Sequence, residues 1–461
     1  MLVTQFFVSN SNITPLSEKI SSIEGINSFI NLETLEINYN TLTIFDISNL
    51  INLKALVCQY NSITSLVMNN NQNLLQLNCD HNQINQINLN TLTNLEVLSC
   101  NNNLISNIDL TGLVNLRSLV ISNNSLSELA TSGLLSLEEI DCHGNFITNL
   151  NLEGLDINYL NFSFNLINSI SLNFLTSLTF LSCSNNQLSN LLIDNLTNLT
   201  FLDCSSNLLT TLFLHTAINS TGLFCRSNLL KTLFIKNGYS DANILDFYDN
   251  PTLEFICCDN FEIELLEFVV DQYGYNCEVN SYCSFTPSEN YNTISGNIKY
   301  DTNNNGCDAN DLAQPNIRVN INDGTNTGAS FTNTVGDYKF YTQAGSFDLT
   351  PEIENPSFFN FTPSTATIPF ANNNNNGANQ DFCISANGVH PDLEVVLAPI
   401  TPARPGFDAT YKLVYKNKGN QTLSGSVNLV FDDAKTDFVS ANPVVDNLAV
   451  NSLTWNYTNL L

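Results

Sequence analysis

Cysteine is the residue type with the most obvious chemistry in this sequence, and most of its copies follow a fixed spacing. Thirteen cysteines occur in 461 residues, and an odd number means that they cannot all pair. Seven occupy one column of a repeating pattern: Cys58, Cys79, Cys100, Cys142, Cys183, Cys204 and Cys225. Such a column could bind a soft metal or form a redox stack, but Ile37, Ile121 and Phe162 hold the same slot elsewhere. A slot that accepts Ile, Phe or Cys is typical of an apolar core, so we predict buried free thiols.

The later cysteines lie at or beyond the end of this pattern. Cys257 is expected to face outward, where it could pair with Cys277 or with Cys283. Cys307 and Cys383 fall in the following region and could join each other. Disulfides of this kind suit an oxidising compartment.

A run rich in Asp and Asn offers a second chemistry, because oxygen side chains at alternate positions before a glycine suit a hard cation such as Ca²⁺. The candidate ligands are Asp301, Asn303, Asn305, Cys307, Asp308 and Asp311. Leu312 stands where an EF-hand-like loop carries Glu. An ordinary Asn/Asp/Gly turn is the alternative. The run is similar to the calcium loops in the B-type repeat domains of bacterial surface adhesins, so calcium is the expected cofactor, with no other.

The elements that position these residues come from an internal repeat. Its anchoring asparagines are Asn40, Asn61, Asn82, Asn103, Asn124, Asn145, Asn165, Asn186, Asn207, Asn228 and Asn250, spaced by 20 to 22 residues. The pattern is that of a leucine-rich repeat, in which a short strand, a turn and an extended return stack on their neighbours. We therefore predict a mainly β protein, with a solenoid of about 11–12 coils and a parallel sheet on its concave side. Each Asn amide should satisfy backbone groups at the turn.

Four segments follow from the change in pattern along the chain. Residues 1–258 form the solenoid, with Cys258 continuing the column of thiols, and residues 259–286 form a cap that contains an amphipathic helix over 260–274 and cysteines. After a linker at Thr286–Ser288, alternating strands predict a small β-sandwich over 287–388 that carries the calcium loop. Residues 389–461 are expected to be an incomplete immunoglobulin-like β-domain.

Composition excludes several classes of function. Lys and Arg number 14 against 43 Asp and Glu, which gives a formal net charge of −29. Nucleic acids and anionic membranes both need clustered cations, so neither is an expected partner. No apolar run is long enough to span a membrane. The first eight residues lack the pattern of a signal peptide, which leaves a cytosolic protein or a secreted one whose ends have been removed.

Catalysis is not expected, because the four histidines, at 81, 143, 215 and 390, have no motif partners. The outward columns of the concave sheet are the better candidate site, since aromatic residues gather towards their C-terminal half. The expected ligand-binding residues are Tyr159, Phe180, Phe201, Phe224, Arg226, Tyr248 and Phe255. Exposed aromatic residues with sparse charge are typical of protein-binding hot spots, and such rings can also stack on sugars. The alternative is that neighbouring rings only shield one another along the sheet.

The repeat L-x-x-L-x-C-x-x-N-x-L, with Cys where most such repeats carry Leu, resembles the leucine-rich-repeat surface proteins of Bacteroidota, especially flavobacteria. The segments Phe255–Asp259, Tyr273–Cys277 and Asn280–Phe285 continue the likeness, as do the immunoglobulin-like strands after His390. The resemblance implies a secreted or cell-surface protein exported by type IX secretion, although the sorting domain of such proteins is missing from this chain. It also implies an internalin-like adhesin that binds a protein partner. A carbohydrate-binding protein serving polysaccharide use is the alternative, and a structural surface-layer role is a third.

Overall fold

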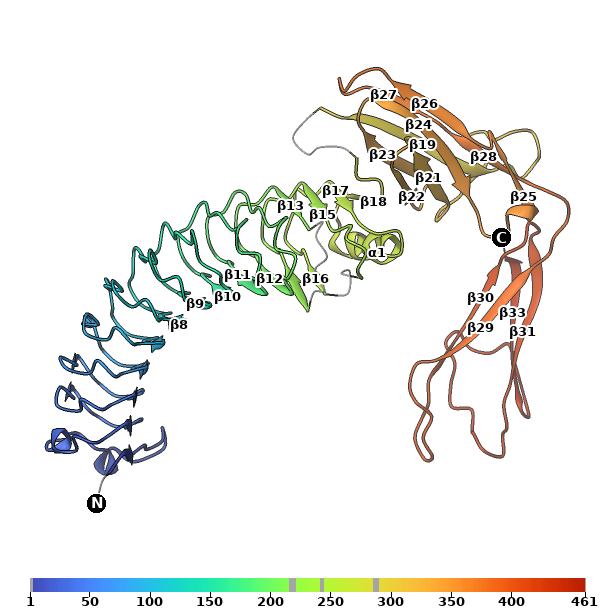
Figure 1. Ribbon diagram of the computed structural model, residues 1–461. Coiled ribbons are helices and arrows are strands. Elements are labelled where there is room, and N and C mark those ends of the chain that lie inside the picture. The colour runs from blue at the N-terminus through green and yellow to red at the C-terminus, as the bar shows by residue number, and fades with distance from the viewer. Residues whose placement is uncertain (1–2, 215–220, 241–243, 285–289, 461) are drawn as a thin grey trace. The chain divides into compact units, whose positions relative to one another are not determined.

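The computed structural model describes residues 3–214, 221–240, 244–284 and 290–460 (Figure 1). The chain divides into two compact units, the first ending at Ser281 and the second beginning at Tyr282. The expected linker at Thr286–Ser288 lies outside the described residues. The boundary comes earlier than expected because Tyr282 belongs to the hydrophobic core of the second unit.

The first unit is a leucine-rich-repeat solenoid, and one parallel sheet of twelve short strands lines the inner side of its curve (Figure 1). The strands are β1 (Gln5–Phe7), β2 (Thr34–Glu36), β4 (Ala55–Val57), β6 (Gln76–Asn78), β7 (Val97–Ser99), β8 (Ser118–Val120), β9 (Glu139–Asp141), β10 (Tyr159–Asn161), β11 (Phe180–Ser182), β12 (Phe201–Asp203), β14 (Gly222–Phe224) and β16 (Leu245–Asp246). Equivalent residues of neighbouring coils pair, so that Leu56 lies opposite Leu35 and Leu77. The predicted fold class is therefore confirmed.

The repeated asparagines form a buried ladder of hydrogen bonds beside this sheet. The Asn124 amide donates to the carbonyl oxygens of Cys100, Ile121 and Ser122 at 2.9–3.2 Å, and its Oδ1 accepts from the backbone N–H of Ile105 at 3.0 Å. Each amide therefore joins its own coil to the preceding coil. This confirms that the Asn side chains satisfy backbone groups that the turn leaves unpaired.

The seven cysteines of the repeat column are free and fully buried. Burial raises the pKa of the Cys142 and Cys183 thiols, because a thiolate loses its hydration there. The column is part of the apolar core, as predicted. Cys258 is also buried but does not continue this column. It follows the strand Phe255–Cys257, which pairs with Thr232–Phe234, and Phe247 precedes the last Asn of the ladder at the spacing of the column.

Short return strands and one helix complete the first unit. The return strands are β3 (Ile44–Asp46) with β5 (Ser65–Val67), and β13 (Thr211–Phe213), β15 (Thr232–Phe234), β17 (Phe255–Cys257) and β18 (Glu278–Asn280). Two 3₁₀ turns, Leu16–Glu18 and Ile26–Ser28, precede β2. Helix α1 (Ile263–Tyr273) buries Ile263, Leu266 and Val270 and ends at Gly274, whose φ of 69° is left-handed. This is the predicted cap. No helix in the described parts of the chain is long and apolar enough to cross a membrane.

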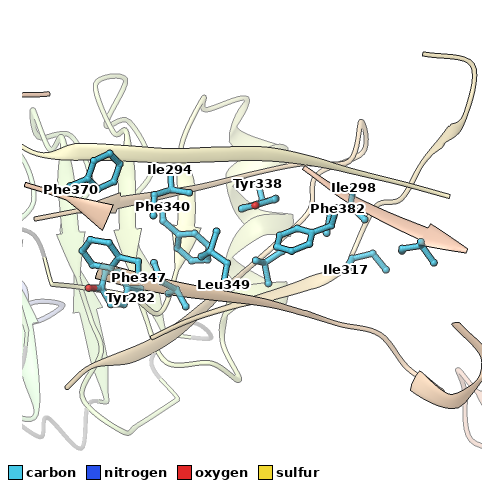
Figure 2. Packing of buried hydrophobic residues seen from close by; sticks show 13 residues of the cluster. Tyr282, Ile294, Ile298, Ile317, Tyr338, Phe340, Phe347, Leu349, Phe370 and Phe382 are labelled. Carbon is cyan, nitrogen blue, oxygen red and sulfur yellow. The ribbon is translucent and has the colours of Figure 1, made fainter. Parts of the chain in front are cut away.

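The second unit begins with a β-sandwich. Its strands are β19 (Asn292–Tyr300), β20 (Leu312–Ala313), β21 (Arg318–Asn322), β22 (Thr327–Phe331), β23 (Asp337–Thr342), β24 (Gly345–Glu352), β25 (Phe359–Thr362), β26 (Ala366–Phe370), β27 (Gly377–Asn379) and β28 (Phe382–Ala386), with a 3₁₀ turn at Pro356–Phe358. One sheet is built around β19 and the other has the order β22-β21-β24-β26. Figure 2 shows Tyr338, Phe340, Phe347 and Phe382 in the core between them.

The last segment forms strands without a comparable core. Strands β29 (Leu393–Pro399) and β30 (Tyr411–Asn417) pair as a hairpin, and β31 (Leu423–Val430), β33 (Ser452–Leu460) and β32 (Asn447–Ala449) form a three-stranded sheet. Among its described residues, Val427 and Leu453 are the apolar side chains that are fully buried. Its turn after β30 is tied to the sandwich, since the Asn420 amide donates to the Phe358 carbonyl at 2.8 Å.

Candidate functional site

Three aromatic rings form a continuous stack on the concave sheet, and we call Tyr159, Phe180 and Phe201 the aromatic ladder. They hold the same register position on β10, β11 and β12. The ring centroids of Tyr159 and Phe180 lie 4.4 Å apart with an interplanar angle of 8°, and those of Phe180 and Phe201 lie 4.5 Å apart at 4°. In-register strands are about 4.8 Å apart, so equivalent rings stack at contact distance. All three side chains are half-buried.

The ladder ends at Gly222, which stands opposite Phe201 on β14. The Phe224 ring lies over this glycine and meets Phe201 with centroids 5.7 Å apart at 47°. A Cβ at Gly222 would lie 2.8 Å from the Phe224 ring and 3.1 Å from the Phe201 ring. The missing side chain therefore lets Phe224 close this end of the ladder.

The other end of the ladder is open. One face of the Tyr159 ring is covered by Phe180, and the opposite face is directed towards β9, where Glu139 is the register partner. A shallow hollow of about 410 Å³ lies there, lined by Glu96, Val97, Arg117, Ser118, Glu138, Glu139, Asn158 and Tyr159. Burial, followed by the charges of Asp141 and Glu139, raises the pKa of the Tyr159 phenol. Sequence reasoning missed this hollow, although Glu139 directly precedes Tyr159 in the same outward column.

Polar residues follow the ladder along the next outward columns. His143 Nδ1 lies 2.6 Å from Asp141 Oδ1, and this hydrogen bond is the main reason why the pKa of His143 is raised. Asp203 Oδ1 accepts the backbone N–H of Ser205 at 3.0 Å. Asp141 and Asp203 thus place negative charge beside the ladder on β9 and β12.

Arg226 and Tyr248 lie beyond Phe224, at the last coil. Arg226 Nη1 is 3.9 Å from Asp246 Oδ2. Tyr248 is 59% exposed, and its ring meets that of Tyr273 of α1 edge-on, with centroids 5.3 Å apart. These two residues border the concave face but are not members of the ladder.

Phe255 does not lie on the concave face, so its expected place in the site was wrong. It is 1% exposed and belongs to β17, in the return sheet with β13 and β15. The concave strand of each coil precedes the ladder Asn, whereas Phe255 follows Asn250 by five residues. Its register partner is Thr232, and its ring packs edge-on against Phe234 with centroids 5.9 Å apart.

The disulfide candidates separate into bonded and free residues. Cys307 and Cys383 form a disulfide, as expected. Cys257 and Cys283 are also disulfide-bonded. Cys277 is free, so its inclusion among the disulfide candidates was wrong. Its Sγ faces the Glu278 carbonyl at 3.7 Å, and burial raises the pKa of its thiol.

In the loop that was expected to bind calcium, two carboxylates accept backbone N–H groups of the same loop. Asp301 and Asp311 are both buried and both turn into the loop. Asp301 accepts the backbone N–H groups of residues 304–306 at 2.6–3.2 Å, and Asp311 accepts those of Thr302 and Asp308. Because the Cys307 sulfur is in the disulfide, only its backbone carbonyl could be a ligand.

Side chains further along this loop are less suited to a metal. Asn303 Oδ1 accepts the Asn305 N–H at 3.1 Å, and Asp308 Oδ1 accepts the Asn310 N–H at 2.7 Å, as in ordinary polar turns. In the described part of the chain, no group of three or more His, Cys, Asp or Glu side chains is arranged to hold a metal. Any ion in the loop would therefore depend on Asn and backbone oxygens as well as carboxylates.

Catalytic groups do not converge around the described histidines. His143 Nε2 faces the Asn123 amide at 3.2 Å, and the nearby hydroxyls of Ser122 and Ser163 donate to Asn101 and Asn161 at 2.7 Å. The other described histidines are stacked on rings, His81 on Tyr60 and His390 on Phe358. His215 lies outside the described residues.

No known protein family matches this sequence, and no curated protein matches it. Several solved structures are similar in fold. One is the functional domain of InlJ from Listeria monocytogenes, which includes a cysteine ladder, at 21% identity over 83% of this chain and 90% of that one, with a TM-score of 0.48. Another is the internalin InlF of Listeria monocytogenes strain 4b F2365, at 23% identity over 60% and 79%, with a TM-score of 0.37. YopM from Yersinia enterocolitica is 21% identical over 52% of each chain, with a TM-score of 0.39. These neighbours are bacterial leucine-rich-repeat proteins, internalins among them.

Proposed function

We propose that this chain is a secreted or cell-surface binding protein of the adhesin kind, which recognises a protein partner through its concave sheet. The aromatic ladder is the observation that carries the proposal. Partly exposed aromatic side chains that a rigid scaffold holds in place lose little entropy on binding, so they are favourable anchors for a protein partner. The β-domains serve as a spacer, and the chain has no catalytic role.

The ring geometry favours a protein partner over a glycan. A sugar stacks on the face of an aromatic ring, but both faces of Phe180 are covered by its neighbours in the ladder. The ladder therefore presents mainly ring edges to a ligand, and edges suit the mixed apolar and polar surface of a protein. The disulfides support an oxidising, extracellular location.

The test compares two double variants in a pull-down from a cell-surface extract. Phe180→Ala/Phe201→Ala removes two rings of the ladder. Phe146→Ala/Phe164→Ala removes two rings that are 57% and 58% exposed outside the sheet strands. We expect the ladder variant to lose a protein that the wild type and the control both capture, with no effect of added sugars. Equal capture by both variants would overturn the proposal, and binding on a glycan array that depends on the ladder would favour the carbohydrate alternative.

We also propose that the loop at Asp301–Asp311 binds Ca²⁺ in a structural role. The buried pair Asp301 and Asp311 supports this, since a divalent cation would compensate both charges. Chelator should lower the melting temperature, and added Ca²⁺ should restore it. Asp301→Asn should abolish this response. An unchanged melting curve in chelator would contradict the proposal.

A further inference from the structure

The open end of the aromatic ladder differs from the rest of the concave face in one respect: a ring face, a hollow and the unpaired carboxylate of Glu139 meet there. The rings of Phe180 and Phe201 stack face to face, and the ring of Phe224 covers the other face of Phe201 at the far end of the ladder. Tyr159 alone in the ladder turns a ring face towards a hollow, the one that Glu139 and Glu96 border.

The charges around this hollow do not balance. Arg117 forms a two-pronged ion pair with Glu138, with nitrogen–oxygen distances of 2.7–3.1 Å, and so compensates that carboxylate. In the described structure neither Glu96 nor Glu139 has an ion pair. Glu139 receives only the Ser118 hydroxyl, at 2.7 Å. Glu139 therefore leaves a carboxylate without a cation beside the open face of Tyr159, and Glu96 leaves another at the β7 side of the hollow, three strands away from Tyr159.

We propose that this hollow is an anchor pocket for an arginine or lysine side chain of a polypeptide partner. The inference rests on the proposed function and names the chemistry of the partner. A cation over the Tyr159 face gains from the ring quadrupole, and Glu139 on the neighbouring strand supplies the opposite charge, while Glu96 adds to the negative potential of the hollow. Arginine fits best, because its planar guanidinium stacks on a ring while it donates to carboxylates at its edge.

The rest of the face agrees with a basic partner. Asp141, Asp203 and Asp246 follow the hollow along the outward positions of β9, β12 and β16, and Arg226 is the cation beside them. Asp141 is paired with His143 and Asp246 with Arg226, but Asp203 has no ion pair in the described structure, so a neutral partner would bury its charge without a cation, which is costly. A basic segment that lies along the ladder would instead be attracted before contact and held in register by the pocket.

The experiment measures fluorescence anisotropy of a labelled twelve-residue peptide of alternating arginine and serine. Glu96→Gln/Glu139→Gln removes the two charges and keeps the side-chain shapes, and Tyr159→Ala removes the ring face. Asp109→Asn/Asp194→Asn is the matched control, because it removes two exposed carboxylates outside the concave strands. We expect each pocket variant to weaken binding about tenfold or more, and the control less than about twofold.

Every outcome decides the inference. If the pocket and control variants weaken peptide binding equally, the effect comes from net charge alone, and the proposed anchor pocket is overturned. Absence of saturable binding to the wild type would overturn it as well. Binding of a neutral oligosaccharide that is lost in Tyr159→Ala but kept in Glu96→Gln/Glu139→Gln would assign the pocket to a sugar. If the pocket variants still capture the protein that Phe180→Ala/Phe201→Ala loses, the concave-face proposal stands and the basic anchor fails.

Discussion

The two halves of the concave sheet have the same interior and different surfaces. From β2 to β14 the middle residue of each concave strand is a buried Leu or Ile, and the ladder Asn makes the same hydrogen bonds in both halves. The first outward column changes character: it holds Thr34, Ala55, Gln76, Val97 and Ser118 in the N-terminal half and Tyr159, Phe180 and Phe201 in the C-terminal half. The buried columns therefore maintain the scaffold, and the outward columns are free to carry recognition.

The largest expected effect tests whether the two interiors are equivalent. Asn103 and Asn207 each accept one backbone N–H, at 3.0 and 2.9 Å, and each donates to three carbonyl oxygens. Alanine at either position leaves several buried backbone groups unpaired, so we expect each variant to lose about 2–4 kcal/mol of unfolding free energy. Urea unfolding with hydrogen exchange measures the global and local losses. A marked difference in the free energy lost by the two variants would show that the interiors of the two halves are not equivalent.

The sequence was sufficient for the scaffold because its signals repeat. Asn124 and Cys100 each recur at the spacing of one coil, and no arrangement other than stacking buries every copy. The cap helix was predictable for a similar local reason, since Ile263, Leu266 and Val270 share one helix face before Gly274. What the pattern could not supply was a boundary set by tertiary contacts, and Tyr282 illustrates this by packing into the second unit.

The candidate site was predictable only as a column of residues. Tyr159, Phe180 and Phe201 follow from the register, but the tilt of Phe224 over Gly222 depends on side-chain packing that one sequence does not encode locally. Phe255 was misplaced because its Leu-x-x-Ile surroundings imitate a concave strand, although it follows the last ladder Asn. The hollow beside Glu139 arises from four coils at once, so no single repeat indicates it.

A smaller effect on stability is expected at the C-terminal end of the solenoid, which should respond to pH where the middle of the solenoid does not. Burial, followed by the charges of Glu278 and Glu264, raises the pKa of Glu267 on α1 to about 8. Between the ordinary value of 4.5 and about 8, the unfolded chain has already lost this proton while the folded chain retains it. Stability should therefore fall as the pH rises through this window, by an amount on the order of 1–3 kcal/mol for a partly exposed group.

Glu267→Gln should remove most of that pH dependence, since the amide cannot ionise. Exposed Glu128 belongs to the middle of the solenoid, and Glu128→Gln is the matched control. Melting temperatures at pH 5 and pH 8 provide the measurement. If both variants keep the full decrease between these pH values, Glu267 is not its origin.

The smallest effect concerns Gly222, which marks the end of the ladder. Its backbone φ is not in the left-handed region, so a side chain is excluded only by the rings of Phe201 and Phe224. Because the closest atoms belong to the far end of a flexible side chain, Gly222→Ala should move Phe224 and cost less than about 1 kcal/mol. Ala55 already carries a Cβ in the same column of the N-terminal half, where no ring lies on the neighbouring strands, so a Cβ is compatible with this backbone.

The Gly222→Ala variant should therefore unfold like the wild type in urea but change the near-ultraviolet circular dichroism of the stacked rings. A large loss of stability would mean that Gly222 serves the scaffold, and an unchanged spectrum would mean that Phe224 does not close the ladder.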